Sequence, residues 1–432
     1  MFCTRSTANK SKLPSGKITA RRTIIAIVAA AGCGWGFWQS GASGRARALG
    51  ESALATAQMN EADEAVRLSP SDAEVHAVRG IVLQQAEKYA EAQLEVERAV
   101  QLRPRDFTVW LLLGIIRDEN QDQEGALLAF QRARALAPAY SQPHWLLGNL
   151  LLRMDQPDEA FAELRKAAAS DPDLLPNVID LAWGIYRGDV DTVLAVVPPQ
   201  TDAAHLDLAL FFARHQQTSI AADQFLSAHV TPASKAEPLL AELLTARAFG
   251  DAYRVWSRMH GLPATEAIGS IRDAGFESPI TVSESGFGWQ IAPDVTNVAM
   301  SIDEGAHQNG SRSLRVDFHG DSNPQSPLLT QIILVKPLTH YHLSLATLTK
   351  DFVSAADPVI TLTDASDPKG ALLAQSTPLR SDANVWRDFT IDFTTNANTQ
   401  AITITLTRQT CTNNPCPAVG TVWLDSVSIE SR

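Results

Sequence analysis

Two cysteines near the C-terminal end of the chain are spaced for redox chemistry. Cys411 and Cys416 enclose the short stretch CTNNPC, which is followed by a proline. A zinc site would need two further ligands nearby, whereas two thiols this close along the chain can form a disulfide across a turn. The spacing favours the disulfide, and a pair of free thiols in a surface loop is the alternative.

No motif in the sequence positions groups for catalysis. The chain has no G-x-S-x-G turn, no H-E-x-x-H helix, no phosphate-binding glycine loop and no clustered pairs of cysteines. Two carboxylates that folding brings together would leave no such motif, so a glycoside-acting enzyme with its site in the C-terminal domain is an alternative. The sequence favours a non-enzymatic protein, in which binding surfaces carry the function.

The charge of the chain is unevenly distributed. Its 432 residues have a net charge of −12, yet residues 1–50 contain eight Lys and Arg and no acidic residue, which leaves 28 basic and 48 acidic residues beyond. An acidic body repels the phosphates of nucleic acid, so the sequence predicts no nucleic-acid partner. A chain of this length is expected to form about two or three domains.

The basic N-terminus precedes a predicted membrane segment. Residues 23–38 contain no charge, and Trp35, Phe37 and Trp38 suit the interface of a bilayer. Since basic residues remain on the cytoplasmic side, we expect a cytoplasmic tail at 1–22 and a membrane anchor or signal segment at 23–40. This interpretation makes the chain a single-pass membrane protein of the bacterial cell envelope, with its bulk outside the cytoplasm.

Two alternatives to a spanning anchor exist for the same segment. The stretch AAGC, which ends at Cys33, is similar to the cleavage box of bacterial lipoproteins and would place a lipid on that cysteine. A signal peptide that is removed after export is the other alternative. Both alternatives keep the body of the chain outside the cytoplasm.

A 34-residue period runs through the middle of the chain. Glycine or alanine recurs at three positions of the period, a larger side chain at a fourth, and proline at its end. Small residues allow two antiparallel helices to approach closely, the larger side chain fills the space between them, and proline ends the second helix. The recurring residues are Gly80, Gly114 and Gly148; Ala92, Ala126 and Ala160; Ala99, Ala133 and Ala167; Val96, Phe130 and Leu164; and Pro70, Pro104, Pro138 and Pro172.

This period and these residue types resemble the tetratricopeptide repeat (TPR), a helix-turn-helix unit. The resemblance predicts clear repeats at 71–104, 105–138 and 139–172, within an α-solenoid over 44–260. Solenoids of this family bind an extended segment of a partner protein along the first helix of each repeat, and Trp145 would anchor it. The alternative is that these side chains pack against a neighbouring helix. The groove residues predicted by the pattern are Glu74, Ala77, Ile81, Gln84, Thr108, Leu111, Ile115, Asp118, Gln142, Trp145, Asn149 and Leu152.

From Asp273 onward the apolar residues follow a period of two. Stretches such as HYHLSLATLT, VITLTD, FTIDFTT and AITITLTR alternate apolar with polar residues, and turn signals such as Asn309-Gly310 separate them. These strands predict an all-β sandwich over residues 273–432. A linker at 261–272 would join it to the solenoid.

The C-terminal domain resembles the jelly-roll carbohydrate-binding modules of bacterial glycoside hydrolases. The resemblance rests on DAGFE from residue 273, GSRSLRV from 310, WRDFTIDF from 386 and VWLDSVSI from 422. In that family an acid of the first motif and an aspartate of the last help to hold a structural calcium, which transfers here to Glu277 and Asp425. Ordinary hydrogen bonds of the two carboxylates are the alternative.

Sugar binding by such a module requires exposed aromatic rings on which a pyranose can stack. Trp289 and Tyr341 are the predicted glycan-binding residues, and a position in the core is the alternative for each. The whole sequence predicts a membrane-anchored envelope scaffold, whose groove binds a protein partner and whose sandwich binds a glycan in polysaccharide assembly or export. A purely structural envelope protein is the other alternative.

Overall fold

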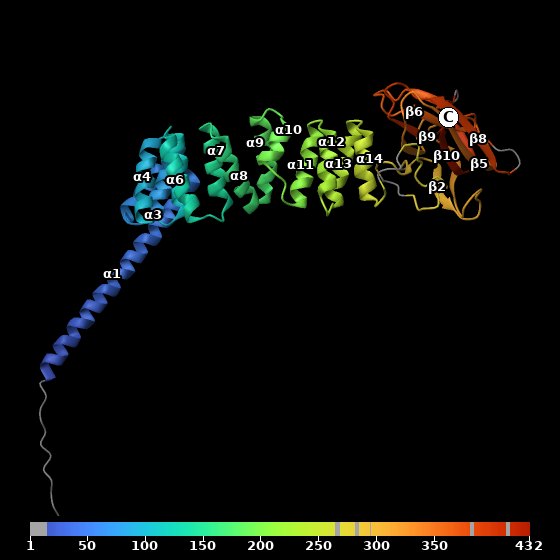
Figure 1. Cartoon of the computed structure of the whole chain (residues 1–432). Helices are drawn as coiled ribbons and strands as arrows, with labels where there is room; N and C mark the ends of the chain where they lie inside the picture. The colour runs from blue at the N-terminus through green and yellow to red at the C-terminus, as the bar shows by residue number, and fades with distance from the viewer. Residues whose placement is uncertain (1–14, 264–267, 281–284, 294, 381–383, 412–414) are drawn as a thin grey trace, which may run out of the picture. The chain divides into compact units, whose positions relative to one another are not determined.

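The computed structural model describes residues 15–263, 268–280, 285–293, 295–380, 384–411 and 415–432. The chain divides into two compact units, Met1–Val197 and Pro198–Arg432. Helices form the first unit and the beginning of the second, and strands form the rest of the second (Figure 1). Of the predicted basic tail, residues 1–14 lie outside the described residues.

The helices of the first unit pack as consecutive pairs. Within the predicted repeats, α3 packs against α4, α5 against α6 and α7 against α8, which confirms a helix-turn-helix solenoid. The elements are α1 (Ser15–Thr56), α2 (Met59–Leu68), α3 (Ala73–Gln85), α4 (Tyr89–Leu102), α5 (Phe107–Glu119), α6 (Gln123–Leu136), α7 (Ser141–Arg153), α8 (Pro157–Ser170), the short 3₁₀ turn η1 (Pro172–Leu174), α9 (Leu175–Ile185) and α10 (Val190–Val196).

The glycine of each repeat permits close contact between its two helices. A Cβ atom at any of the three glycines would overlap the larger side chain of the facing helix, so another residue would push the pair apart. The distances from such a Cβ to the nearest side-chain atom are 2.3 Å from Gly80 to Val96, 2.4 Å from Gly114 to Phe130 and 2.7 Å from Gly148 to Leu164. The predicted role of both sets of residues is therefore confirmed.

The first helix, α1, contains the predicted membrane segment 23–40 and continues into the repeats (Figure 1). Near its C-terminal end, Ala46 and Ala53 are fully buried against α2 and α3. This end therefore pairs with α2 as a further helix pair ahead of the three clear repeats. Among the residues that the structure describes, no helix is both long and apolar enough to cross a membrane.

The second unit begins with two more helix pairs of the same kind. Ala221, Phe225 and Ala228 in one pair, and Ala252 and Trp256 in the other, are buried at the positions where the earlier repeats carry their small and large residues. The repeat pattern therefore continues after residue 172. The helices are α11 (Asp202–Arg214), α12 (Thr218–Ser227), α13 (Ala233–Thr245) and α14 (Phe249–Met259).

The remainder of the second unit is a sandwich of two antiparallel sheets, as predicted. One sheet has the strand order β1-β4-β9-β6-β7 and the other β2-β3-β10-β5-β8. The strands are β1 (Gln290–Ile291), β2 (Val298–Asp303), β3 (Ser313–Asp321), β4 (Leu329–Leu334), β5 (His340–Ser354), β6 (Pro358–Asp364), β7 (Leu372–Gln375), β8 (Arg387–Thr394), β9 (Ala401–Arg408) and β10 (Pro417–Ser431).

Alternation along the strands builds the core between the sheets. In β8, for example, Phe389, Ile391 and Phe393 are buried while the residues between them are exposed. Side chains of both sheets meet in one apolar cluster, which also contains Phe276 from the segment before β1. Burial of these side chains is what drives the two sheets together.

Candidate functional site

The first helices of the repeats carry the predicted groove residues on one face. Side chains at the C-terminal ends of these helices connect one repeat to the next. Gln84 Nε2 on α3 donates to Glu119 Oε2 on α5 at 2.7 Å, and the guanidinium of Arg153 on α7 donates to Asp118 on α5. Polar pairs therefore join three successive first helices along this face.

Most predicted groove residues keep part of their surface accessible. Leu111 is the exception, because it is 3% exposed and packs in a core cluster with Phe130 and Leu147. The prediction that Leu111 lines the groove is therefore wrong, since its side chain lies in this core. Of the others, Glu74, Thr108 and Gln142 are exposed, and Ala77, Ile81, Gln84, Ile115, Asp118, Trp145, Asn149 and Leu152 are half-buried.

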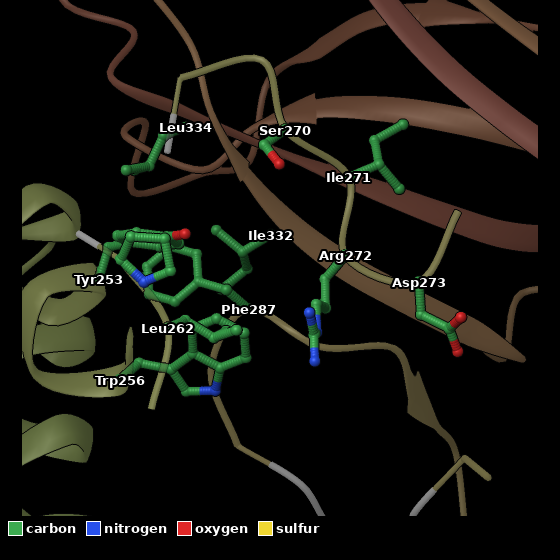
Figure 2. Close-up of a pocket in the computed structure, with 11 residues that line it drawn as sticks. Tyr253, Trp256, Leu262, Ser270, Ile271, Arg272, Asp273, Phe287, Ile332 and Leu334 are labelled. Carbon is green, nitrogen blue, oxygen red and sulfur yellow. The ribbon is translucent and has the colours of Figure 1, made fainter. Parts of the chain in front are cut away.

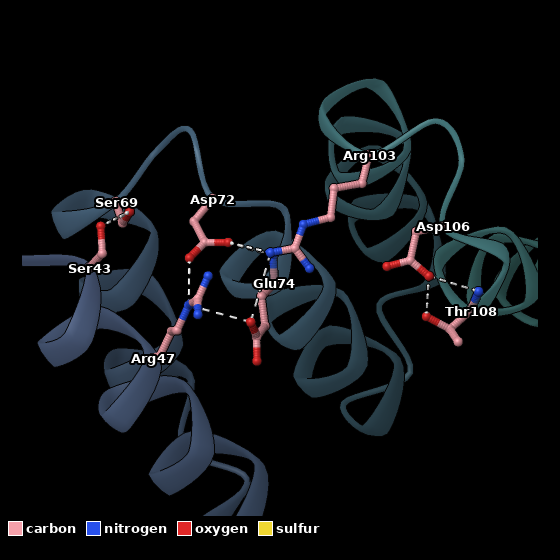
Figure 3. Close-up of polar contacts among 8 residues, drawn as sticks. All are labelled: Ser43, Arg47, Ser69, Asp72, Glu74, Arg103, Asp106 and Thr108. Carbon is pink, nitrogen blue, oxygen red and sulfur yellow. Dashed lines mark hydrogen bonds and ion pairs between the residues drawn. The ribbon is translucent and has the colours of Figure 1, made fainter. Parts of the chain in front are cut away.

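An ionic cluster ties α1 to the N-terminal end of this face (Figure 3). Asp72 caps α3 by accepting from the backbone N–H of Glu74 at 3.1 Å, and it accepts from Arg47 Nε at 2.8 Å and Arg103 Nη2 at 3.4 Å. Burial opposes ionisation of Asp72, but these hydrogen bonds outweigh it and lower the pKa of the carboxyl. Arg47 also lies 3.4 Å from the Glu74 carboxylate, so Glu74, the first of the predicted groove residues, already has an ionic partner.

Thr108, the first predicted groove residue of the second repeat, is also paired locally. Asp106 accepts from both the backbone N–H and the hydroxyl of Thr108, at 3.0 and 2.7 Å (Figure 3). The N-terminal ends of α3 and α5 are therefore satisfied by side chains of their own repeats. The more accessible apolar positions of the face lie further along the helices.

Two of the three first helices, α3 and α7, each carry a buried histidine that contacts the preceding loop and the second helix of its repeat. His76 Nε2 lies 3.0 Å from the carbonyl oxygen of Pro70, and His76 Nδ1 lies 2.7 Å from Glu95 Oε2. A carbonyl only accepts, so Nε2 carries the proton there, and pairing Nδ1 with a carboxylate requires the imidazolium. The hydrogen bond to Glu95 accordingly raises the pKa of His76.

The same arrangement recurs at His144, which contacts Glu163 and the carbonyl of Pro138. In the repeat between them, Trp110 Nε1 donates to the carbonyl of Pro104 at 3.0 Å, and no acid is needed. These histidines and their acidic partners were not among the residues predicted from the sequence. A glutamate 19 residues after each histidine, at Glu95 and Glu163, was the available signal.

The two aromatic residues predicted to bind a glycan are core residues. Trp289 is 5% and Tyr341 2% exposed, and both belong to the apolar cluster between the sheets. Trp289 stacks on Phe276 with 5.1 Å between the ring centroids, and its indole N–H donates to the carbonyl oxygen of Asp273. Neither ring can present a face to a sugar, so this assignment is corrected.

The two residues predicted to hold calcium meet at the loop before β3. Both Asp425 oxygens accept from backbone N–H groups, Oδ2 from Gln308 at 2.7 Å and Asn309 at 3.0 Å and Oδ1 from Ser426 at 2.6 Å. Glu277 accepts through Oε1 from the Ser311 N–H at 2.9 Å and through Oε2 from the Ser311 hydroxyl at 2.7 Å.

The donors around these two carboxylates do not fit a cation. Calcium requires several oxygen ligands, whereas N–H and O–H groups already occupy all four carboxylate oxygens. Hydrogen bonding also lowers the pKa of Glu277, chiefly through Ser311. Through these hydrogen bonds the two acids join the first and last segments of the sandwich to the loop at residues 308–312.

Cys411 and Cys416 form a disulfide at the end of the sandwich. Beside it, the guanidinium of the buried Arg408 donates to the carbonyl oxygens of Ala356 and Ser322 and contacts the sulfur of Cys416 at 3.4 Å. Burial lowers the pKa of Arg408. The disulfide is thus part of a structural network. Residues 412–414, between the two cysteines, lie outside the described residues.

Comparison with known proteins shows similarity only to solved structures. Neither a protein-family model nor any curated protein matches the sequence. MamA of Desulfovibrio magneticus RS-1, from residue 41 to its end, is similar at 20% identity and a TM-score of 0.32, over 36% of this chain and 90% of that chain.

Two further structures are similar to parts of the chain. YrrB, a TPR protein with an unusual peptide-binding site, is similar at 21% identity and a TM-score of 0.27, over 33% of this chain and 77% of that one. A CBM4 structure is similar at 15% identity and a TM-score of 0.29, over 38% of this chain and 100% of that one. At these TM-scores the function has to be inferred from the geometry of the chain itself.

Proposed function

We propose that the chain is a non-enzymatic scaffold whose helical repeats bind an extended segment of a partner protein. The segment lies along the first helices α3, α5 and α7, and Trp145 is its main anchor. Aromatic side chains contribute much of the binding energy when a partner covers them completely. The sandwich serves as a second module of the same scaffold.

One observation carries this proposal. The apolar side chains of Ile81, Ile115, Trp145 and Leu152 remain partly accessible on a single face of three successive helices. The polar pairs between neighbouring helices hold these side chains at a fixed spacing. A preformed apolar row suits an extended ligand, because little of the protein has to be ordered when the ligand binds.

Site-specific photo-crosslinking in the native cell tests the groove. A photoreactive amino acid in place of Trp145 should give a discrete covalent adduct with one partner. The matched control replaces Leu128, which is 65% exposed on the second helix α6 and therefore lies outside the proposed groove. Equal adducts at both positions would contradict the proposal. Once the partner segment is known, Trp145→Ala should weaken binding by about 2 kcal/mol, or about 30-fold.

We propose in addition that the N-terminal segment attaches the chain to the bacterial envelope membrane. Support comes from the basic residues of 1–22 and from the uncharged stretch 23–38. Ile25 and Trp35 of this stretch are more than half exposed on α1, as an apolar surface in contact with lipid would be. Retention of the full chain in membranes after alkaline washing would support the proposal, and its complete release would refute it.

A glycan ligand for the sandwich is a further proposal, supported by the two-sheet architecture alone. Trp423 on β10 is no simple platform, because Arg315 lies over its ring and its indole N–H donates to Asp303 at 2.7 Å. Affinity electrophoresis of the full chain through gels with envelope polysaccharides would show retardation if a glycan binds. Unchanged mobility across the panel would leave the sandwich as a structural module.

A further inference from the structure

A cavity lies within the second unit, between the last helix of the repeats and the sandwich (Figure 2). Its volume is about 120 Å³. For comparison, an apolar cavity of roughly 150 Å³ accommodates benzene. The walls come from α14, from the segment that follows it, from the residues just before β1, and from β4. The apolar lining residues are Tyr253, Trp256, Leu262, Pro263, Ile271, Phe287, Ile332 and Leu334.

The aromatic wall of the cavity is held rigidly. The rings of Tyr253 and Trp256 meet Phe287 edge to face, with centroid distances of 5.1 and 5.7 Å. Gly286 permits this packing, since its φ is +111° and a Cβ there would lie 2.4 Å from Cδ1 of Trp256. A side chain in place of this glycine would displace the indole.

Trp256 brings an unused donor to this wall. The residue is 1% exposed, and its indole N–H has no hydrogen-bond partner in the described part of the chain. A buried N–H without an acceptor is rare in folded proteins, because its lost hydration is not replaced. An oxygen atom of a bound molecule would supply the missing acceptor.

Arg272 brings a positive charge to the same cavity. Among the described residues its guanidinium has no ion-pair or hydrogen-bond partner. The neighbouring Asp273 does not neutralise it, since the two Asp273 carboxylate oxygens accept from the backbone N–H groups of Glu277 and Ser278 at 2.8 and 3.1 Å. Figure 2 shows the side chains of Arg272, Trp256 and Phe287 near one another among the residues that line the cavity.

From these contacts we infer that the cavity binds a small monocarboxylate with an apolar body of about six carbon atoms. The carboxylate pairs with the guanidinium of Arg272, and one of its oxygens reaches toward the indole N–H of Trp256. The apolar body packs against Phe287 and Ile332. Such a ligand touches both α14 and the sandwich, so its binding stabilises their association.

Thermal unfolding of the full chain with benzoate as the probe tests this inference. Benzoate should raise the melting temperature saturably, because a ligand that binds only the folded state stabilises it. Intrinsic tryptophan fluorescence should change over the same concentrations, since Trp256 lines the cavity. Benzyl alcohol, which has the same ring and no charge, should act only at concentrations about tenfold higher.

Three variants decide the outcome. Arg272→Gln should weaken the benzoate effect about tenfold through loss of a charged hydrogen bond, and Ile332→Phe should remove it by filling the cavity. Lys336→Gln, which removes an exposed charge outside the cavity, should respond like the parent chain. If Ile332→Phe fails to fold, Arg272→Gln alone decides. Absence of any response up to about 10 mM benzoate, which covers the affinities of ligands this small, overturns the inference. An equal response of Arg272→Gln and Lys336→Gln, or equal potency of benzyl alcohol, overturns it too.

Discussion

The imidazole of His76 and the carboxylate of Glu95 form a largely buried pair, with 2.7 Å between Nδ1 and Oε2. Burial opposes ionisation of the Glu95 carboxyl, yet its hydrogen bond with His76 and the charge of Arg79 outweigh burial and lower its pKa. The raised pKa of His76 and the lowered pKa of Glu95 have the same origin, since each residue stabilises the charged form of the other.

This pair predicts a pH-dependent contribution to stability. The His76 contribution is complete below the ordinary pKa of 6.5 and is lost as the pH rises through its raised pKa, and the Glu95 contribution is complete above 4.5 and is lost as the pH falls through its lowered pKa. The loss of unfolding free energy in His76→Phe should therefore be greatest between pH 4.5 and 6.5 and smaller near pH 9. Urea unfolding of both chains across this range measures it, and a pH-independent difference would contradict the ion pair.

The middle repeat supplies the control for this prediction. Trp110 makes the corresponding bond to a proline carbonyl, and Ala129 stands where the neighbouring repeats have their glutamates. The double variant His76→Trp, Glu95→Ala gives the first repeat the same tryptophan and alanine that the middle repeat has. It should recover much of the stability lost in His76→Phe while removing the pH dependence.

A second prediction concerns the glycines of the repeats. Gly114→Ala places a Cβ 2.4 Å from the ring of Phe130 and should lower the free energy of unfolding by about 1–3 kcal/mol through overpacking. Gly44→Ala is the matched control, because nothing lies within 4 Å of a Cβ at that position of α1. It should be neutral or stabilising by up to about 1 kcal/mol. Denaturant unfolding followed by helical circular dichroism measures both, and equal effects would mean that the helix contacts are misassigned.

A third prediction separates core aromatics from ligand platforms in the sandwich. Trp289→Ala should cost about 3–5 kcal/mol through the cavity it leaves, and Tyr341→Ala should be similarly severe. Val419→Ala on the exposed side of β10 should change stability by no more than about 0.5 kcal/mol. Thermal unfolding measures all three. Unchanged stability in Trp289→Ala would contradict a core position for Trp289 and would make it a candidate sugar contact again.

A fourth prediction follows from the hydrogen bonds of Glu277 and Asp425. Because N–H and O–H donors occupy their carboxylate oxygens, a chelator should leave the melting temperature of the sandwich unchanged. Asp425→Asn should in contrast lower it, since two backbone N–H groups lose a charged acceptor, at a cost of about 1.5–3 kcal/mol. A fall in melting temperature with chelator that added calcium reverses would show that an ion does bind.

Periodicity predicted the features of the fold that depend on local spacing. The recurrence of Gly114 and Phe130 in neighbouring repeats located the close helix contacts, because the same geometry has to be satisfied in every repeat. Alternation located β3, β5, β6, β8, β9 and β10 for a similar reason, but it did not mark β4 or β7. Both signals lie within one element or one repeat, so they can be recognised without knowledge of the tertiary structure. Alternation along β5 places Tyr341 on the same face as Leu343 and Leu345, so the sequence did indicate its burial, and the glycan assignment overlooked that signal.

Features that depend on contacts between distant segments were not predictable in this way. Leu111 lies in a cluster with side chains of α6 and α7, and the repeat period does not specify that packing. The cavity at Arg272 needs residues from four segments, and no spacing along the chain joins them.

The contact between Trp256 and Phe287 has a consequence for how the repeat array ends. Trp256 stands at the large position of the last helix pair, and in an open array its outer side would receive a further helix. Gly286 and Phe287 of the sandwich domain occupy that side. An uncovered terminal repeat allows solenoids to associate end to end, and repeated association of that kind produces fibres. Because Phe287 of the same chain lies against Trp256, a second copy could receive that side of Trp256 only by displacing Phe287.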